Sequence, residues 1–229
     1  MDILQTPPQS ATKRVVAAFD FDGTLSRGVS GIRFYGHLLG PFRSVWMAVR
    51  HSIDAFCFTF RLGHEASMDR CNRHVFRGRR AEDVQRAATY FSENILPRHL
   101  LPEGMARLQA HLARGDRCVI VTRGFAWCVT PWALKTGVHD VIASHLEIAP
   151  EGVLTGRLTE VSCDGEQKRV RLLNLLGDRS QWEVHAYGDS PGDHEMFATA
   201  DHAFIRRGDE FVPWRPEPIR TKKKTALRA

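Results

Sequence analysis

Four short apolar runs constrain the fold of this 229-residue chain more than any other feature of its sequence. Each is rich in β-branched or aromatic side chains and ends near a polar or turn-forming residue, as buried parallel strands do. They are RVVAAFDF (14–21), RCVIVT (117–122), EVHAYGD (183–189) and HAFIR (202–206). Helical patterns lie between them, at 103–115, 165–177 and 191–200. Strands that alternate with helices of this length predict an α/β fold with a doubly wound parallel sheet.

Residues 29–100 interrupt this alternation because they contain helical patterns only. Between 41 and 63, apolar side chains recur at three- and four-residue steps while charged side chains fall on the other face. This stripe consists of Phe42, Val45, Trp46, Val49, Ile53, Phe56, Cys57 and Phe60. We therefore predict a flexible lead-in at 1–13, an α/β core at 14–28 and 101–215, an inserted helical cap at 29–100, and a basic tail at 216–229.

Composition and charge narrow the class of protein. A hydrophobic share of 43% and a charged share of 25% are those of an ordinary soluble globular protein. The five cysteines form no CxxC pair, which favours reduced thiols in the cytoplasm. The eleven histidines show no metal-ligand spacing. Despite the net charge of +6, no motif indicates nucleic acid, and neither a secretory signal nor an uninterrupted membrane span is found. The sequence is silent on oligomeric state.

Polar residues stand where three of the predicted strands end. Asp20 and Asp22 stand at or just past the end of the first strand, Thr122 ends the second and Asp189 ends the third. Ligands of doubly wound sheets bind at the carboxyl ends of the strands. We therefore expect these polar side chains to lie together at that edge of the sheet, which we call the rim. Close carboxylates repel unless a cation accompanies them. Mg²⁺, bound by carboxylates and a substrate phosphate, fits such a site.

The paired aspartates offer two chemical roles, an ionised nucleophile and a neighbour that gives and takes a proton. Gly23 permits a tight turn directly after them, and the hydroxyl of Thr24 can fix the loop. Asp193 supplies a further carboxylate, but it can also cap the helix that opens after Asp189, and the two roles are compatible.

Four motifs, in order along the chain, resemble those of the haloacid dehalogenase (HAD) superfamily. FDFDGTL (19–25) is similar to its first motif DxDGT, and VIVTRGF (119–125) to its second. Lys168 in CDGEQKRVRLL matches the third motif, and GDSPGD (188–193) the fourth. TRGF and the stretch 144–158 are similar to the phosphoserine-phosphatase-like group, subfamily IB. The resemblance covers nearly the whole chain and implies a HAD-like, Rossmannoid core with an inserted helical cap.

The resemblance implies an Mg²⁺-dependent phosphatase. Asp20 would attack phosphorus to form an aspartyl-phosphate, and Asp22 would protonate the leaving oxygen and later deprotonate the attacking water. Asp20, the backbone carbonyl of Asp22, and Asp189 would hold the metal. Asp193 would be an outer ligand or would orient Lys168.

The same resemblance assigns the groups that bind phosphate. Lys168, the Thr122 hydroxyl and backbone N–H groups of the strand loops, including Gly124, would hold the phosphoryl oxygens. Arg123 is either a cation on the substrate side or a surface residue. It stands where relatives carry a small residue, and SRGVSGIRF (26–34) lacks the carboxylate that phosphoserine phosphatases use for the ammonium group. Both departures argue for a small-molecule phosphomonoester other than phosphoserine.

Three alternatives stay open. The enzyme could hand the phosphoryl group to a second hydroxyl, as a phosphotransferase or mutase does. It could act on a phospholipid headgroup (as phosphatidylglycerophosphate phosphatases do), since a basic amphipathic cap helix and the tail IRTKKKTALRA suit peripheral contact with an anionic inner membrane face. A catalytically retired binding protein on the same scaffold is the alternative from another class.

Overall fold

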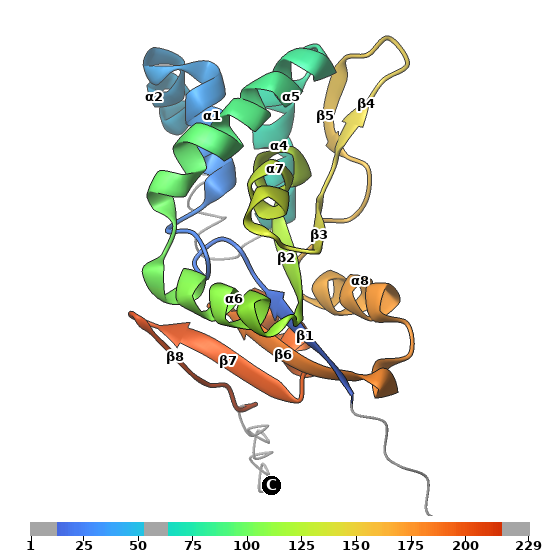
Figure 1. The fold of residues 1–229 in the computed structure, drawn as a ribbon. Coiled ribbons are helices and arrows are strands. Elements are labelled where there is room, and N and C mark those ends of the chain that lie inside the picture. Colours follow the sequence, from blue (N-terminus) through green and yellow to red (C-terminus); the bar gives the residue numbers. More distant parts are fainter. Residues whose placement is uncertain (1–12, 53–63, 217–229) are drawn as a thin grey trace, which may run out of the picture.

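The computed structural model describes residues 13–52 and 64–216. Within these residues the centre is a six-stranded sheet in the order β3-β2-β1-β6-β7-β8 (Figure 1). The five strands from β3 to β7 are parallel to their neighbours, and β8 is antiparallel to β7. The strands are β1 (Arg14–Phe19), β2 (Arg117–Phe125), β3 (Asp140–Ser144), β6 (Trp182–Gly188), β7 (His202–Arg207) and β8 (Glu210–Pro213). The predicted α/β fold with a doubly wound parallel sheet is confirmed.

The sheet differs from the prediction in its shorter elements. The sequence pattern does not identify β3 and β8, because strands of five and four residues are too short for their apolar pattern to be distinctive. Strand β2 continues to Phe125, beyond the predicted end at Thr122. The register of its pairing with β3 shifts between Val121 and Phe125, as at a β-bulge. With this irregularity the strand continues through Gly124, a residue type that often marks a turn.

Helices cover both faces of the sheet. Ala17 and Phe19 of β1 belong to a core that includes Leu108 of α6 (Pro102–Arg114) and Val129 of α7 (Ala126–Thr136). Val16 and Ala18 belong to a second core with α8 (Glu166–Leu176) and the short helix α9 (His194–Phe197). Successive side chains of a strand point to opposite faces, so β1 contributes to both cores. This double burial accounts for its continuous apolar sequence.

The described part of 29–100 is helical, as predicted. It contains α1 (Ser30–Leu39), α2 (Pro41–Arg50), α4 (His64–Phe76) and α5 (Ala81–Tyr90), followed by a π-helical turn (Phe91–Ile95) and a 3-10 turn (Leu96–His99). These helices lie beyond the carboxyl ends of the central strands (Figure 1). An antiparallel hairpin of β4 (Leu146–Ile148) and β5 (Leu154–Leu158) packs against α4. The division into core and cap domains at these boundaries stays a prediction.

Aromatic side chains join the cap helices to the sheet. Phe125, at the end of β2, packs edge-on against Phe76 of α4 with ring centroids 5.2 Å apart. Phe34 of α1 packs against Phe76 and Phe91, and these four rings are buried. Edge-to-face pairs of this kind add to the stabilisation from apolar burial. The cap helices are therefore held directly above the end of β2.

Several predicted features lie outside the described residues. They are the lead-in at 1–12, the residues Ile53, Phe56, Cys57 and Phe60 of the apolar stripe, and the basic tail at 217–229. Among the helices that the structure describes, none combines the length and the apolar character needed to cross a bilayer.

A substitution at Gly104 can test how closely α6 packs against the loop after β1. A Cβ atom at this position would lie 2.2 Å from the carbonyl oxygen of Thr24, so the loop would have to move. We expect Gly104→Ala to lower the free energy of unfolding by about 1–3 kcal/mol, measured by urea denaturation.

Gly36 in α1 is the matched control, since a Cβ atom there would meet only the Ser44 Oγ, at 3.9 Å. Gly36→Ala should be neutral or stabilise by up to about 1 kcal/mol, because alanine favours a helix interior. Equal losses in the two variants would contradict close packing at Gly104.

Candidate active site

A tight turn at the carboxyl end of β1 brings the two aspartates of the first motif into position. The N–H of Asp20 donates to the carbonyl of Tyr187 in β6 at 2.8 Å, and the N–H groups of Leu25 and Ser26 both donate to the carbonyl of Phe21. Gly23 has a φ of +90°, and a Cβ there would lie 2.2 Å from an oxygen of Asp189. The predicted need for glycine in this turn is therefore both conformational and steric.

A buried ion-pair network lies directly after this turn. The Lys168 Nζ in α8 donates to an oxygen of Asp20 at 2.5 Å and to an oxygen of Asp193 at 2.6 Å. The exposed fractions of Asp20, Lys168 and Asp193 are 5%, 3% and 0%. Burial alone would lower the pKa of Lys168, but the two carboxylates outweigh burial and raise that pKa. Lys168 is therefore a permanent cation between two acidic side chains.

Asp193 makes contacts compatible with both roles that the sequence left open for it. One of its oxygens accepts the hydrogen bond from Lys168. The other accepts the N–H groups of Asp189 and Ser190 at 3.1 and 3.0 Å and the Ser190 hydroxyl at 3.1 Å. Ser190 and Asp193 form a capping box on the short 3-10 turn that follows β6. A single carboxylate thus orders the loop and orients Lys168.

Asp20, Asp189 and Asp193 form a group of acidic side chains that fits a cation. One carboxylate oxygen from each lies within 4.8 Å of the others. Burial raises the pKa of Asp20 and raises the pKa of Asp189 to about 6, and the neighbouring Asp193 adds to both shifts. Because one Lys168 cannot neutralise three carboxylates, a hard divalent ion with oxygen ligands, such as Mg²⁺, suits this arrangement.

Asp22 is not one of these three carboxylates and contacts the start of α1. Its two oxygens accept the N–H of Ser30 at 2.9 Å and the Ser30 hydroxyl at 3.0 Å. Ser30 is the first residue of α1 and is buried. Burial raises the pKa of Asp22, and the bonds from Ser30 oppose that rise. Sequence reasoning missed Ser30. Its place at a helix start just after the first motif is the signal that could have identified it.

The remaining predicted residues surround the end of β2 and the first turn. The buried Thr122 accepts the N–H of Gly124 on its hydroxyl oxygen at 3.0 Å. The Thr24 hydroxyl donates to Asp20 at 3.4 Å, which supports the predicted role of Thr24 in fixing the loop. Arg123 donates to Asp164 at 3.2 Å, with 26% of its side chain exposed. Arg123 is thus a half-buried, ion-paired side chain.

A cavity of about 290 Å³ opens beside Asp22, between β2 and the cap helices α1, α2 and α4. Asp22, Arg123 and Gly124 are among its lining residues. The other lining side chains are largely apolar and include Ile32, Tyr35, Met47, Met68 and Phe125. The cavity can therefore take a small organic group next to a carboxyl group and a guanidinium group.

Comparisons with known proteins agree with this geometry. A family model described as haloacid dehalogenase-like hydrolase matches residues 17–198. The chain is 29% identical over 192 residues to Protein CicA of Caulobacter vibrioides. This match covers 84% of the chain and 86% of CicA. It is 27% identical over 109 residues to a histidinol-phosphatase of Neisseria meningitidis serogroup C, which covers 45% of this chain and 49% of that protein.

Solved structures share the fold. A protein of unknown function from Bordetella pertussis Tohama I superposes with a TM-score of 0.71 at 24% identity, covering 84% of this chain and 89% of its own. A phosphoserine phosphatase holding an analogue of its phospho-aspartyl intermediate superposes with a TM-score of 0.57 at 20% identity, covering 83% and 85%. At these identities the similarity concerns the fold alone, a HAD-like α/β core.

Because the pKa of Asp189 is raised, we predict that the stability of the metal-free protein depends on pH. Its pKa is about 6 in the folded state, above the ordinary value of 3.8, so the folded state holds this proton more tightly. The resulting stabilisation is complete below pH 3.8 and is lost as the pH rises through 6. We expect Asp189→Asn to remove this loss and to be more stable than the wild type at pH 7.5, by on the order of 2 kcal/mol.

Urea unfolding in the presence of a chelator, at pH 4.5 and pH 7.5, measures this difference. The advantage of Asp189→Asn should shrink toward pH 4.5. Asp209→Asn, at a carboxylate whose side chain is 95% exposed, is the matched control and should leave the pH profile unchanged. A constant difference between Asp189→Asn and wild type at both pH values would contradict the raised pKa.

Proposed function

The chain belongs to the haloacid dehalogenase-like hydrolase family, and on that premise we propose that it hydrolyses a small-molecule phosphomonoester through an aspartyl-phosphate, with Mg²⁺ as cofactor. The coarser statement, that it is a phosphoric monoester hydrolase, agrees with the family and with the histidinol-phosphatase relative. The observation that carries the finer proposal is the contact of Lys168 with both Asp20 and Asp193 beside Asp189.

Asp20 is the nucleophile in this proposal. One of its oxygens is held by Lys168, which favours the ionised form against the effect of burial. Its other oxygen attacks phosphorus, an O–P bond forms, and the bond from phosphorus to the substrate oxygen breaks. Asp20, the carbonyl of Asp22, and Asp189 would hold Mg²⁺. When bound, the ion would offset the charge of the carboxylates and of the phosphoryl oxygens.

Asp22 is the acid and base. Burial raises its pKa, so its protonated form is accessible nearer to neutral pH than that of a solvated aspartate. The two bonds from Ser30 fix its carboxyl group at the wall of the cavity. Asp22 gives its proton to the leaving oxygen and then takes a proton from the water that hydrolyses the aspartyl-phosphate.

Lys168, Thr122 and Arg123 bind the phosphate in this proposal, whereas the N–H of Gly124, for which the same role was predicted, donates to Thr122. Because the Thr122 oxygen already accepts the N–H of Gly124, its hydroxyl hydrogen is available to donate to a phosphoryl oxygen. The half-buried Arg123 guanidinium reaches the cavity wall, where it can face the substrate. The cavity beside them suits an organic leaving group of modest size. The intact set of acidic side chains and Lys168 argues against a retired scaffold.

Replacing Asp20 tests the mechanism. Asp20→Asn removes the nucleophilic oxygen, so we expect hydrolysis of an aryl phosphate to fall by at least roughly 10³-fold. Chelation of Mg²⁺ should abolish turnover in the wild type, and added Mg²⁺ should restore it. Asp209→Asn is the matched control and should keep full activity, because this carboxylate is exposed. Undiminished turnover by Asp20→Asn would refute the proposal, and release of free phosphate separates a hydrolase from a phosphotransferase or mutase.

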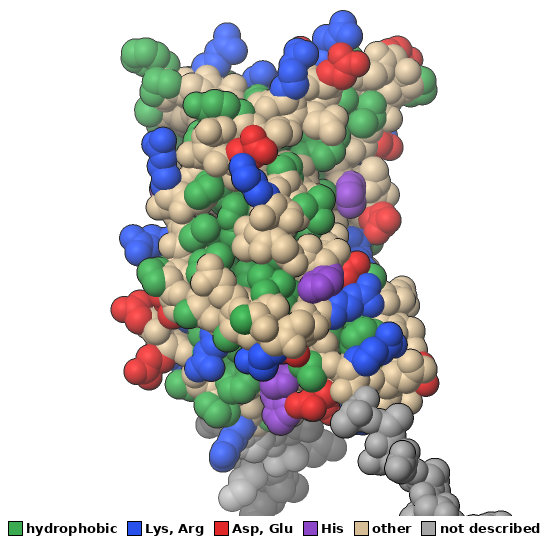
Figure 2. All heavy atoms as spheres, viewed as in Figure 1, with side chains coloured by type: hydrophobic (Ala, Val, Ile, Leu, Met, Phe, Trp, Pro, Cys, Tyr) green, Lys and Arg blue, Asp and Glu red, His purple; other side chains and the backbone are tan. Residues whose placement is uncertain are grey.

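A second candidate substrate is the headgroup phosphate of a phospholipid. The observation that favours it is α2, none of whose residues is buried. Phe42, Val45, Trp46 and Val49 are exposed by 89%, 66%, 55% and 71%, and hydrophobic side chains are visible over α2 at the upper left of Figure 2. Met47 of the same helix lines the cavity, so a lipid held at α2 could present its phosphate there. The enzyme would then work at the cytoplasmic face of a membrane.

Vesicle co-sedimentation tests this candidate. We expect the wild type to bind anionic vesicles more than neutral ones, and the double variant Phe42→Ser and Val49→Ser to bind about tenfold less, because apolar area is lost from α2. Leu134→Ser is the matched control, since this leucine of α7 is also 58% exposed. Failure of the wild type to bind anionic vesicles at low salt would exclude the lipid candidate while leaving the phosphatase proposal intact.

A further inference from the structure

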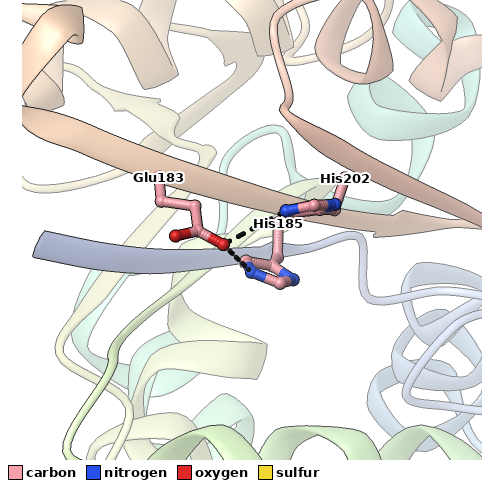
Figure 3. A group of neighbouring side chains, drawn as sticks. All are labelled: Glu183, His185 and His202. Carbon is pink, nitrogen blue, oxygen red and sulfur yellow. Dashed lines mark hydrogen bonds and ion pairs between the residues drawn. The ribbon is translucent and has the colours of Figure 1, made fainter. Parts of the chain in front are cut away.

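Two histidines and a glutamate meet where the first half of β6 pairs with the start of β7 (Figure 3). His185 of β6 lies opposite His202 of β7 in the register of the parallel pair. Glu183 precedes His185 by two residues and so points to the same face of the sheet. Its Oε1 lies 3.2 Å from the Nε2 of His185 and 3.1 Å from the Nε2 of His202.

These distances suit a metal ion. A tetrahedral site with metal–nitrogen and metal–oxygen bonds of about 2.0–2.2 Å separates its ligand atoms by roughly 3.3–3.5 Å. The two distances from Glu183 Oε1 are within a few tenths of an ångström of that spacing, and one ligand atom from each of the three residues lies within 4.8 Å of the others. The side chains of Glu183, His185 and His202 are 42%, 20% and 49% exposed, so an ion and a water ligand can reach the group from solvent.

A third histidine packs against this group. His111 packs edge-on against His185, with ring centroids 5.1 Å apart. The two nitrogens of His111 are engaged by Asp116 at 2.7 Å and by Tyr187 at 2.9 Å, so His111 supports His185 without competing for an ion. Glu183 and Asp116 supply negative charge around the ring of His185.

We propose that Glu183, His185 and His202 form a second metal site, which binds one Zn²⁺ or a similar borderline divalent ion and connects β6 to β7. Two imidazoles and one carboxylate select such ions, whereas Mg²⁺ prefers an all-oxygen site. His185 lies four residues before Asp189 on the same chain segment, which puts roughly 13 Å between the two positions at about 3.3 Å per residue. The ion would therefore act on the sheet, apart from the reaction at Asp20.

Zinc titration of the full chain tests the site. The protein is stripped with chelator, supplied with excess Mg²⁺ to occupy the carboxylates near Asp20, and titrated with Zn²⁺ against a chromophoric chelator. We expect one equivalent of Zn²⁺ in the wild type and a rise in Tm of roughly 5 °C on binding. His202→Ala and Glu183→Ala should each lose that equivalent and the rise in Tm. His202 is exposed, so its variant should fold, as circular dichroism would verify.

Two controls keep the assignment specific. His145→Ala removes an exposed histidine from the connection between β3 and β4 and should bind Zn²⁺ like the wild type. Asp189→Asn alters the acidic group near Asp20 and should also keep the equivalent. Retention of the equivalent by folded His202→Ala and Glu183→Ala, or its loss in Asp189→Asn, would overturn the proposal. The first result would leave Glu183 as an ion-pair partner of the histidines only, and the second would assign the zinc to the other carboxylates.

Discussion

The ammonium group of Lys168 holds the rim of this sheet together. Asp20 and Asp193 come from loops that are 173 residues apart in the sequence, and both are buried. Burial of either carboxylate without a partner would be strongly destabilising. The lysine makes both tolerable, and Asp193 in turn binds the loop that carries Asp189. The loops after β1 and β6 therefore depend on one charge supplied by α8.

The acidic side chains at this rim that suit catalysis also lower the stability of the metal-free protein. Three acidic side chains lie around one lysine, and the pKa values of Asp20 and Asp189 are raised. Such a group is costly in a metal-free protein and becomes useful when a divalent ion and a phosphate share it. The aromatic contacts between Phe125 and Phe76 hold the cap helices over the same rim, which encloses the cavity beside Asp22.

Much of this arrangement could be predicted because its signals are local. The apolar run of β1 predicts a strand buried on both faces, and the parallel sheet then implies that Asp20, Thr122 and Asp189 meet at one end. Ser30 and the apolar cavity could not be predicted in the same way. Both depend on the position of α1 after the first motif. That position is set by packing among side chains that are distant in sequence.

The histidines illustrate the same limit. Their spacing along the chain indicates no metal site, because His185 and His202 are 17 residues apart and become neighbours only through the pairing of β6 with β7. The sequence by itself determined the fold class, the family and the residues at the strand ends, since each follows from short-range patterns and motifs. Only the tertiary structure decided which side chains face one another across strands and across the cap, because those contacts arise from long-range packing and register.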